Sequence, residues 1–216
     1  MPWRRPAQDD PLKALAAELL PGTGLINFMD DSILPELVVN GGRLSEVEER
    51  WLSYVRFAHQ AEANLVLSAC SSVGELVEKA GRLVPIPVLR IDEAMCDEAV
   101  RRACTIGVAA TLPITLDPTL RLIQRKAGAA GKPVKIRSAL ASSAYQKLMA
   151  GDKAGHDAEL LAVLQELAGE VELIVLAQAS MAQVLPGLSP ADQARFLSNP
   201  RSGMERVKQV MEGIDA

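Results

Sequence analysis

The sequence predicts an α/β fold made of two similar lobes, each a parallel sheet flanked by helices. Short apolar runs alternate with longer amphipathic segments, a pattern typical of βαβ units. Glu170 begins a stretch that can be laid over the one beginning at Glu62, 108 residues earlier. This self-similarity indicates a duplicated lobe. The chain has 216 residues, enough for two small lobes that share an interface.

The expected strands are short apolar runs bounded by turn residues. In chain order they span residues 24–29, 65–68, 86–89, 105–109, 134–136 and 172–176. Pro85 and Pro87 lie at the start of the third run and limit its length. The last run is continuously apolar, as in a strand buried on both faces.

The expected helices follow these strands and carry apolar residues at helical spacing. They span residues 45–63, 73–83, 93–103, 117–130, 142–149, 155–167 and 201–214. Ser45 and Glu48 have the spacing of a capping box, and Asp117-Pro118 supplies an N-cap and a first-turn proline. Pro11 is placed to begin a helix after a loose arm that contains Pro2 and Pro6.

Composition argues against several classes of protein. Apolar residues make up 49 % and charged residues 23 % of the chain, as in a packed soluble protein, and the net charge is −4. Without a basic surplus, and with 3 % aromatic residues, we expect no nucleic-acid partner. No apolar run reaches the length of a membrane helix, and the beginning of the chain is not a secretion signal. We therefore expect neither membrane association nor export.

Motifs for cofactors and metals are missing as well. The sequence has no GxGxxG after a strand, no GxxxxGK[ST] and no GxSxG. The three cysteines form no CxxC, and the two histidines are too few for the usual zinc spacing. We expect no cofactor, no metal and three thiols in the reducing cytoplasm.

The two repeated stretches, 62–72 and 170–180, share the motif A-x-x-S at the carboxyl end of a strand. Ligands of open parallel sheets bind at that edge. Two facing lobes would form a cleft with Cys70 on one wall and Gln178 on the other. The alternative is that two buried strands are similar by chance.

Cys70 is the strongest candidate for chemistry. It lies between a buried strand and a helix expected to begin near Val73, where backbone N–H groups stabilise a thiolate and bind carboxylates. Ser71 and Ser72 add hydroxyl donors. The alternative is a buried thiol beside a Ser72–Glu75 capping box.

Other polar side chains end strands of the same kind. Thr111 follows the strand that opens the second half, and Thr115 either points to the same edge or serves a turn. Asn27, Asp30 and Asp31 end the first expected strand, where an acidic residue is either a base or a loop residue.

His156 begins a helix beside Asp157, either as a proton shuttle or as a surface residue. Cys96 and Cys104 lack a polar turn, and we expect both to be buried structural thiols.

Several separated segments resemble the aspartate/glutamate/hydantoin racemase superfamily. Cys70-Ser71-Ser72 matches the first-lobe motif, cysteine followed by Asn or Ser and then Thr or Ser. The second-lobe motif L-G-C-A-G-M-A corresponds to residues 176–182, L-A-Q-A-S-M-A, with Gln178 in place of the second cysteine. Residues 107–111 resemble the strand that opens the second lobe, and residues 197–206 the segment that returns to the first.

The resemblance implies two flavodoxin/Rossmann-like lobes related by a pseudo-twofold axis, with the ligand cleft between them. The first lobe would span residues 1–100 plus 196–216, and the second 101–195. The implied chemistry is cofactor-independent proton transfer at a carbon next to a carboxylate or carbonyl of a small acid. The implied assembly is a homodimer. Family enzymes use two cysteines on opposite faces of the substrate. Gln178 cannot ionise, so this chain is expected to work with a single catalytic cysteine.

Cys70 is then the acid/base thiol or nucleophile of an isomerase. The expected substrate-binding residues are Ser71, Ser72, Thr111, Gln178, Ala179, Ser180 and Asn27. His156 or Asp31 could supply the missing proton. The alternatives are a lyase of the arylmalonate-decarboxylase type and a small-acid binding protein without catalysis. Related decarboxylases keep the second-lobe cysteine, whereas this chain keeps the first.

Overall fold

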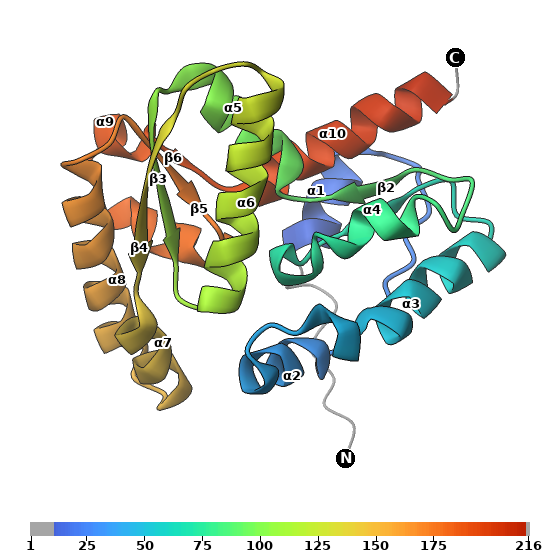
Figure 1. The fold of residues 1–216 in the computed structure, drawn as a ribbon, viewed down its shortest axis with the longest axis horizontal. Coiled ribbons are helices and arrows are strands. Elements are labelled where there is room, and N and C mark those ends of the chain that lie inside the picture. Colours follow the sequence, from blue (N-terminus) through green and yellow to red (C-terminus); the bar gives the residue numbers. More distant parts are fainter. Residues whose placement is uncertain (1–10, 215–216) are drawn as a thin grey trace.

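The chain is built around two parallel β-sheets (Figure 1). The computed structural model describes residues 11–214. The larger sheet has the strand order β4-β3-β5-β6 and the smaller sheet pairs β1 with β2, all in parallel. The strands are β1 Val66–Ser68, β2 Val88–Arg90, β3 Thr105–Ala110, β4 Lys135–Leu140, β5 Leu173–Leu176 and β6 Phe196–Leu197. The predicted α/β fold with parallel sheets is confirmed.

Helices follow or connect these strands. The α-helices are α1 Pro11–Leu19, α2 Ile33–Asn40, α3 Glu48–Gln60, α4 Leu76–Ala80, α5 Glu93–Arg102, α6 Pro113–Ala129, α7 Ser142–Met149, α8 Lys153–Ala168, α9 Pro190–Gln193 and α10 Asn199–Ile214. Three segments are 3₁₀ helices: η1 Leu44–Glu46, η2 Ser71–Val73 and η3 Ala179–Gly187. None of the helices in the described part of the chain is long and apolar enough to cross a membrane.

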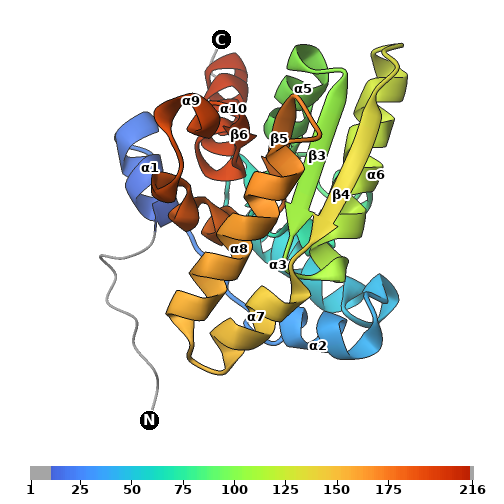
Figure 2. The ribbon, with the colours of Figure 1, turned by 90° about the vertical axis from the view of Figure 1, so that its left-hand side faces the viewer.

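Helices cover both faces of the larger sheet, with α5 and α6 on one side and α8 on the other (Figures 1 and 2). Alternate strand residues point to opposite faces. Ile106 and Val108 accordingly pack in the cluster formed with α5 and α6, whereas Ile174 packs in the cluster formed with α8. Gly107 leaves room for Leu167, since a Cβ there would lie 2.9 Å from a Leu167 methyl. This double cover explains why β3 and β5 read as continuously apolar runs.

The smaller sheet is covered in the same way. Val66 and Val88 pack with a cluster from α2, α3 and α4, and Leu67 and Leu89 pack with a cluster from α1 and α10. Apolar burial on both faces therefore stabilises each sheet. Helix α10 begins after the last strand of the larger sheet and packs on α1 and α5. Division of the chain at residues 100 and 196 remains a proposal. Phe196, the first residue of the expected returning segment, still pairs with the larger sheet.

The strand predicted at residues 24–29 is absent, and this prediction was wrong. The segment has no regular structure, and Leu25 and Met29 are 57 % and 74 % exposed. Its apolar pattern suits a strand, but it forms no ladder with either edge of the smaller sheet. Helix α2, which follows it, was not predicted.

Two helix starts also differ from the prediction. Val47 is the N-cap of α3 and no side chain caps that end, so Ser45 and Glu48 form no capping box. Helix α6 begins at Pro113 and contains Pro118. Pro113 supplies the first-turn signal earlier than the predicted Asp117-Pro118 start.

Other boundaries vary in their agreement with the prediction, since β4 continues to Leu140 beyond the predicted 134–136, and β6 and α9 were not predicted. Helix α7 has the predicted bounds, and α1 begins at Pro11 as expected. The predicted helix at residues 73–83 is divided into η2 and the short α4. Pro2 and Pro6 lie outside the described residues.

Candidate active site

Cys70 lies on the turn that follows β1. Its backbone is extended, with φ −120° and ψ 115°, and η2 begins at the next residue. The carbonyl of Cys70 accepts the N–H of Val73 at 3.3 Å, and the carbonyl of Ser71 accepts that of Gly74 at 3.1 Å. Cys70 is half-buried and has a free thiol. The turn therefore holds a thiol at the carboxyl end of a strand, as predicted.

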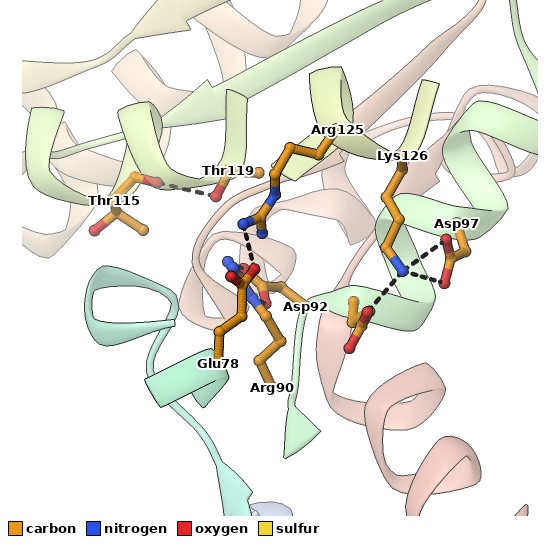
Figure 3. Close-up of polar contacts among 9 residues, drawn as sticks. Glu78, Arg90, Asp92, Asp97, Thr115, Thr119, Arg125 and Lys126 are labelled. Atoms are coloured by element: carbon orange, nitrogen blue, oxygen red, sulfur yellow. Dashed lines mark hydrogen bonds and ion pairs between the residues drawn. The ribbon is translucent and has the colours of Figure 1, made fainter. Parts of the chain in front are cut away.

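Ser72 joins this turn to the other half of the chain. Its hydroxyl lies 3.1 Å from that of Thr115 on α6, and both side chains are buried. The hydroxyl of Thr119 donates to the Thr115 carbonyl at 2.9 Å (Figure 3). Glu75 is itself the N-cap of α4 and no side chain caps that end, so Ser72 and Glu75 form no capping box. Among residues 11–214, the neighbouring Ser71 hydroxyl makes no side-chain hydrogen bond.

Gln178 and Thr111 meet at the carboxyl edge of the larger sheet. Thr111 follows β3, Gln178 follows β5 by two residues, and these strands are neighbours. The Oε1 of Gln178 accepts the Thr111 backbone N–H at 2.7 Å and the Thr111 hydroxyl at 2.9 Å. A backbone N–H can only donate, so the carboxamide must present its oxygen to Thr111. The Nε2 group, which can only donate, is left for another partner.

The turns at Cys70 and Gln178 have the same local structure. Gln178 has φ −126° and ψ 129°, close to the values for Cys70, and it also precedes a 3₁₀ helix. Ala179 and Ser180 begin that helix and are exposed. The similarity of residues 62–72 and 170–180 is thus accompanied by the same strand–turn geometry.

Asp30 is held by neighbouring donors. The backbone N–H and hydroxyl of Ser32 donate to one carboxylate oxygen at 3.0 and 2.5 Å, and the Tyr54 hydroxyl donates to the other at 2.8 Å. Arg50 forms an ion pair with it at 3.0 Å. These contacts, led by the Ser32 hydrogen bond, lower the pKa of Asp30. Asp30 is thus suited to hold the loop before α2, whereas Asp31 is exposed.

Asn27 and His156 are not joined to the Cys70 and Gln178 turns by any hydrogen bond of the described residues. Asn27 is exposed in the irregular segment before α2. His156 lies in the first turn of α8, is 9 % exposed, and places its Nδ1 2.8 Å from a carboxylate oxygen of Asp157. Hydrogen bonds from Lys153 and His156 lower the pKa of Asp157.

The two remaining cysteines differ from each other. Cys96 is fully buried in α5, and burial raises the pKa of its thiol well above the usual range, which makes it a poor nucleophile. Cys104 is exposed just before β3, so the prediction that it is buried was wrong. No three His, Cys, Asp or Glu side chains of the described residues are placed to hold a metal ion.

A family model described as Asp/Glu/hydantoin racemase matches residues 12–205. Among solved structures, glutamate racemase RacE1 from Bacillus anthracis gives a TM-score of 0.71 at 13 % identity, over 94 % of this chain and 77 % of that one. An aspartate racemase homologue from Pyrococcus horikoshii gives 0.65 at 11 % identity, over 92 % and 89 %. Allantoin racemase from Klebsiella pneumoniae gives 0.59 at 17 % identity, over 93 % and 81 %. No curated protein matches the sequence. At these identities the structures establish a shared fold.

Proposed function

Because the chain belongs to the Asp/Glu/hydantoin racemase family, and is thereby an enzyme of the isomerase or lyase type, we propose that it moves a proton on the carbon next to a carboxylate or carbonyl of a small acid. Cys70 is the acid/base thiol. The proposal rests above all on the paired turns, one carrying Cys70 and the other carrying Gln178 with its oxygen turned to Thr111. No cofactor takes part in the proposed reaction.

Cys70 acts in the proposed reaction as a single base. Its thiolate takes the α-proton, so that an S–H bond forms while the C–H electron pair moves toward the substrate oxygen. Gln178 supports this charge through its Nε2 donors, because Thr111 occupies its Oε1. The thiol then returns a proton to the carbon from the same side. Exchange without inversion is the consequence, since Gln178 cannot supply a proton from the opposite face.

Four of the remaining proposed binding groups directly follow these two residues in the sequence, Ser71 and Ser72 after Cys70 and Ala179 and Ser180 after Gln178. The other two are Thr111 and Asn27. Ser71 is favoured as a direct ligand because its hydroxyl is uncommitted, while that of Ser72 is shared with Thr115. His156 and Asp31 remain candidates for a second acid or base only if inversion is observed.

Decarboxylation is the second candidate, because it needs one proton donor. The C–C bond of a malonate-type substrate breaks, carbon dioxide leaves, and the thiol of Cys70 protonates the carbanion before regaining a proton from water.

We also propose a cytoplasmic enzyme, supported by three free thiols in the described chain. A homodimer is proposed from the family resemblance.

Proton exchange in heavy water tests the proposal. The protein is incubated with a panel of amino acids, hydantoins, hydroxy acids and malonates, and NMR follows the α-proton and carbon signals. We expect exchange or decarboxylation that falls by about 100-fold or more in C70A, since a lost general base costs that much. The control is C104S, which removes the exposed thiol outside the site.

Turnover that survives in C70A would remove Cys70 from the mechanism. Inversion at the α-carbon would show a second proton donor and contradict the single-thiol mechanism. Ligand-induced shifts without turnover across the panel would favour a binding protein over an enzyme.

A further inference from the structure

A buried ion pair lies beside the turn that carries Cys70. Arg90 ends β2, and Asp92 precedes α5. The guanidinium donates twice to the carboxylate, Nε to Oδ1 at 2.7 Å and Nη2 to Oδ2 at 2.8 Å (Figure 3). The exposed fractions of the two residues are 5 % and 0 %. Bidentate contact holds the plane of the guanidinium in one orientation.

The guanidinium packs against Gly74, which closes the Cys70 turn. A Cβ on Gly74 would lie 2.6 Å from both Cζ and Nη2 of Arg90. The backbone of Gly74 has ordinary helical angles, φ −57° and ψ −28°, so the glycine is required for space and not for conformation. Because the N–H of Gly74 donates to the carbonyl of Ser71, Arg90 bears directly on the residue that fixes the turn.

The same arginine is aligned with the strand that leads into the turn. Ser68, two residues before Cys70, pairs with Arg90 in the parallel ladder. The carbonyl of Ser68 accepts the N–H of Ile91 at 3.0 Å. Cys70 therefore lies between two segments that both rest on the end of β2, Ser68 through the ladder and Gly74 through the guanidinium.

Stability alone does not account for this ion pair. Removing two charges from water is costly, and apolar residues of similar volume often replace such pairs without loss of stability. The Nη1 of Arg90 is buried and has no hydrogen-bond partner within the described chain. A buried donor without a partner adds a further cost.

We propose that Arg90, held by Asp92, is a positioning residue that sets the place of the Cys70 thiol through Gly74. Asp92 fixes the guanidinium, the guanidinium supports the turn, and the turn directs the thiol. The effect on turnover rests on the proposed function, whereas the effect on the turn can be measured without it.

The first test is G74A, which drives a methyl group into the guanidinium. We expect the NMR amide signals of Ser71 and Ser72 to move and the exchange rate at saturating substrate to fall by about 10- to 100-fold, as for a reacting group displaced by about 1 Å. The matched control is G81A, at the end of the adjoining α4. A Cβ there meets only ordinary contacts, the nearest at 3.7 Å, so we expect unchanged signals and rates.

The second test replaces the pair with apolar residues, R90M/D92L. We expect a folded protein, with a melting temperature within about 5 °C of the parent, whose exchange rate falls by a similar factor while KM changes little. When G74A is added to R90M/D92L, we expect the exchange rate to fall by less than about 2-fold further, because the flexible methionine can move away from the added methyl group.

Different results contradict different statements. Equal effects of G74A in both backgrounds, or unmoved amide signals, would overturn the positioning role. An unfolded R90M/D92L would show that the pair serves stability instead. Unimpaired turnover in C70A would overturn the proposed function alone, since the amide signals still report whether Arg90 positions the turn.

Discussion

The orientation of one carboxamide determines what the second-lobe turn can contribute. Thr111 provides two donors to Oε1 of Gln178, so its Nε2 group is the part left to contact a ligand. An N–H₂ group donates and cannot accept, which favours a carboxylate or carbonyl oxygen as its partner. Both residues were predicted as binding residues, but their mutual hydrogen bonds were not.

The isosteric substitution Q178E tests this orientation. One glutamate oxygen can still accept from Thr111, while the other places negative charge where Nε2 was. We expect kcat/KM for a carboxylate substrate to fall by about 10-fold or more, as for the loss of a hydrogen bond to a charged group. The control is Q209E, the same charge change on the exposed face of α10. Equal kcat/KM values for Q178E and its parent would exclude Nε2 as a contact of the reacting substrate.

At the scale of the elements, turns after strands carry the candidate site. β1 and β5 each lead through an extended residue into a 3₁₀ helix, and β3 leads to Thr111 and α6. The positions of Cys70, Gln178 and Thr111 after these strands were predicted, whereas the two 3₁₀ helices and the start of α6 at Pro113 were not. The segment at 24–29 shows the limit of this reasoning, since an apolar run becomes a strand only when a partner strand is available.

Asp30 follows the segment 24–29 and contacts Tyr54 and Arg50 of α3, so its ionisation makes the stability of the folded protein depend on pH. Its pKa is lowered in the folded protein, so its contribution to stability is present above the unfolded pKa of about 3.9 and is lost as the pH falls through the folded value. We expect D30N to lower the free energy of unfolding at pH 7 and to flatten its decline between about pH 5 and pH 2. Urea unfolding across this range measures both effects. The exposed D31N is the control, and an equal pH slope for D30N and the parent would contradict the assignment.

At the scale of the whole molecule, a polar seam joins η2 and α4 to α6. It combines the buried Ser72–Thr115 contact with two exposed ion pairs, Glu75–Arg121 and Glu78–Arg125, each at 2.5 Å. Figure 3 shows Arg125 reaching from α6 to Glu78. Exposed pairs contribute little and are screened by salt, whereas a buried hydrogen bond is not.

The two parts of the seam should therefore respond differently to mutation. We expect T115V to lower the free energy of unfolding by about 1–3 kcal/mol at both low and high salt, because it leaves the Ser72 hydroxyl buried without its partner. We expect R121A/R125A to lower the free energy of unfolding by less than T115V does, and this effect should disappear at about 1 M salt. Urea unfolding at two salt concentrations checks this. A T115V effect that vanishes at high salt would contradict it.

The sequence by itself determined the class of fold, most strands and helices, and the two turns with Cys70 and Gln178. Buried parallel strands are recognisable from apolar runs alone, and a departure from a family motif is visible at a single position. Charged residues in the run V-L-R-I-D were a signal of the Arg90–Asp92 pair, but one that sequence reasoning missed.

Only the tertiary structure decided which side chains meet. Thr111 with Gln178, Ser72 with Thr115, and Arg90 with Gly74 are separated by 67, 43 and 16 positions. Local propensity carries no information about such contacts, because strand order and helix packing bring them together. The same packing left residues 24–29 without a strand partner and Cys104 exposed, against the local pattern.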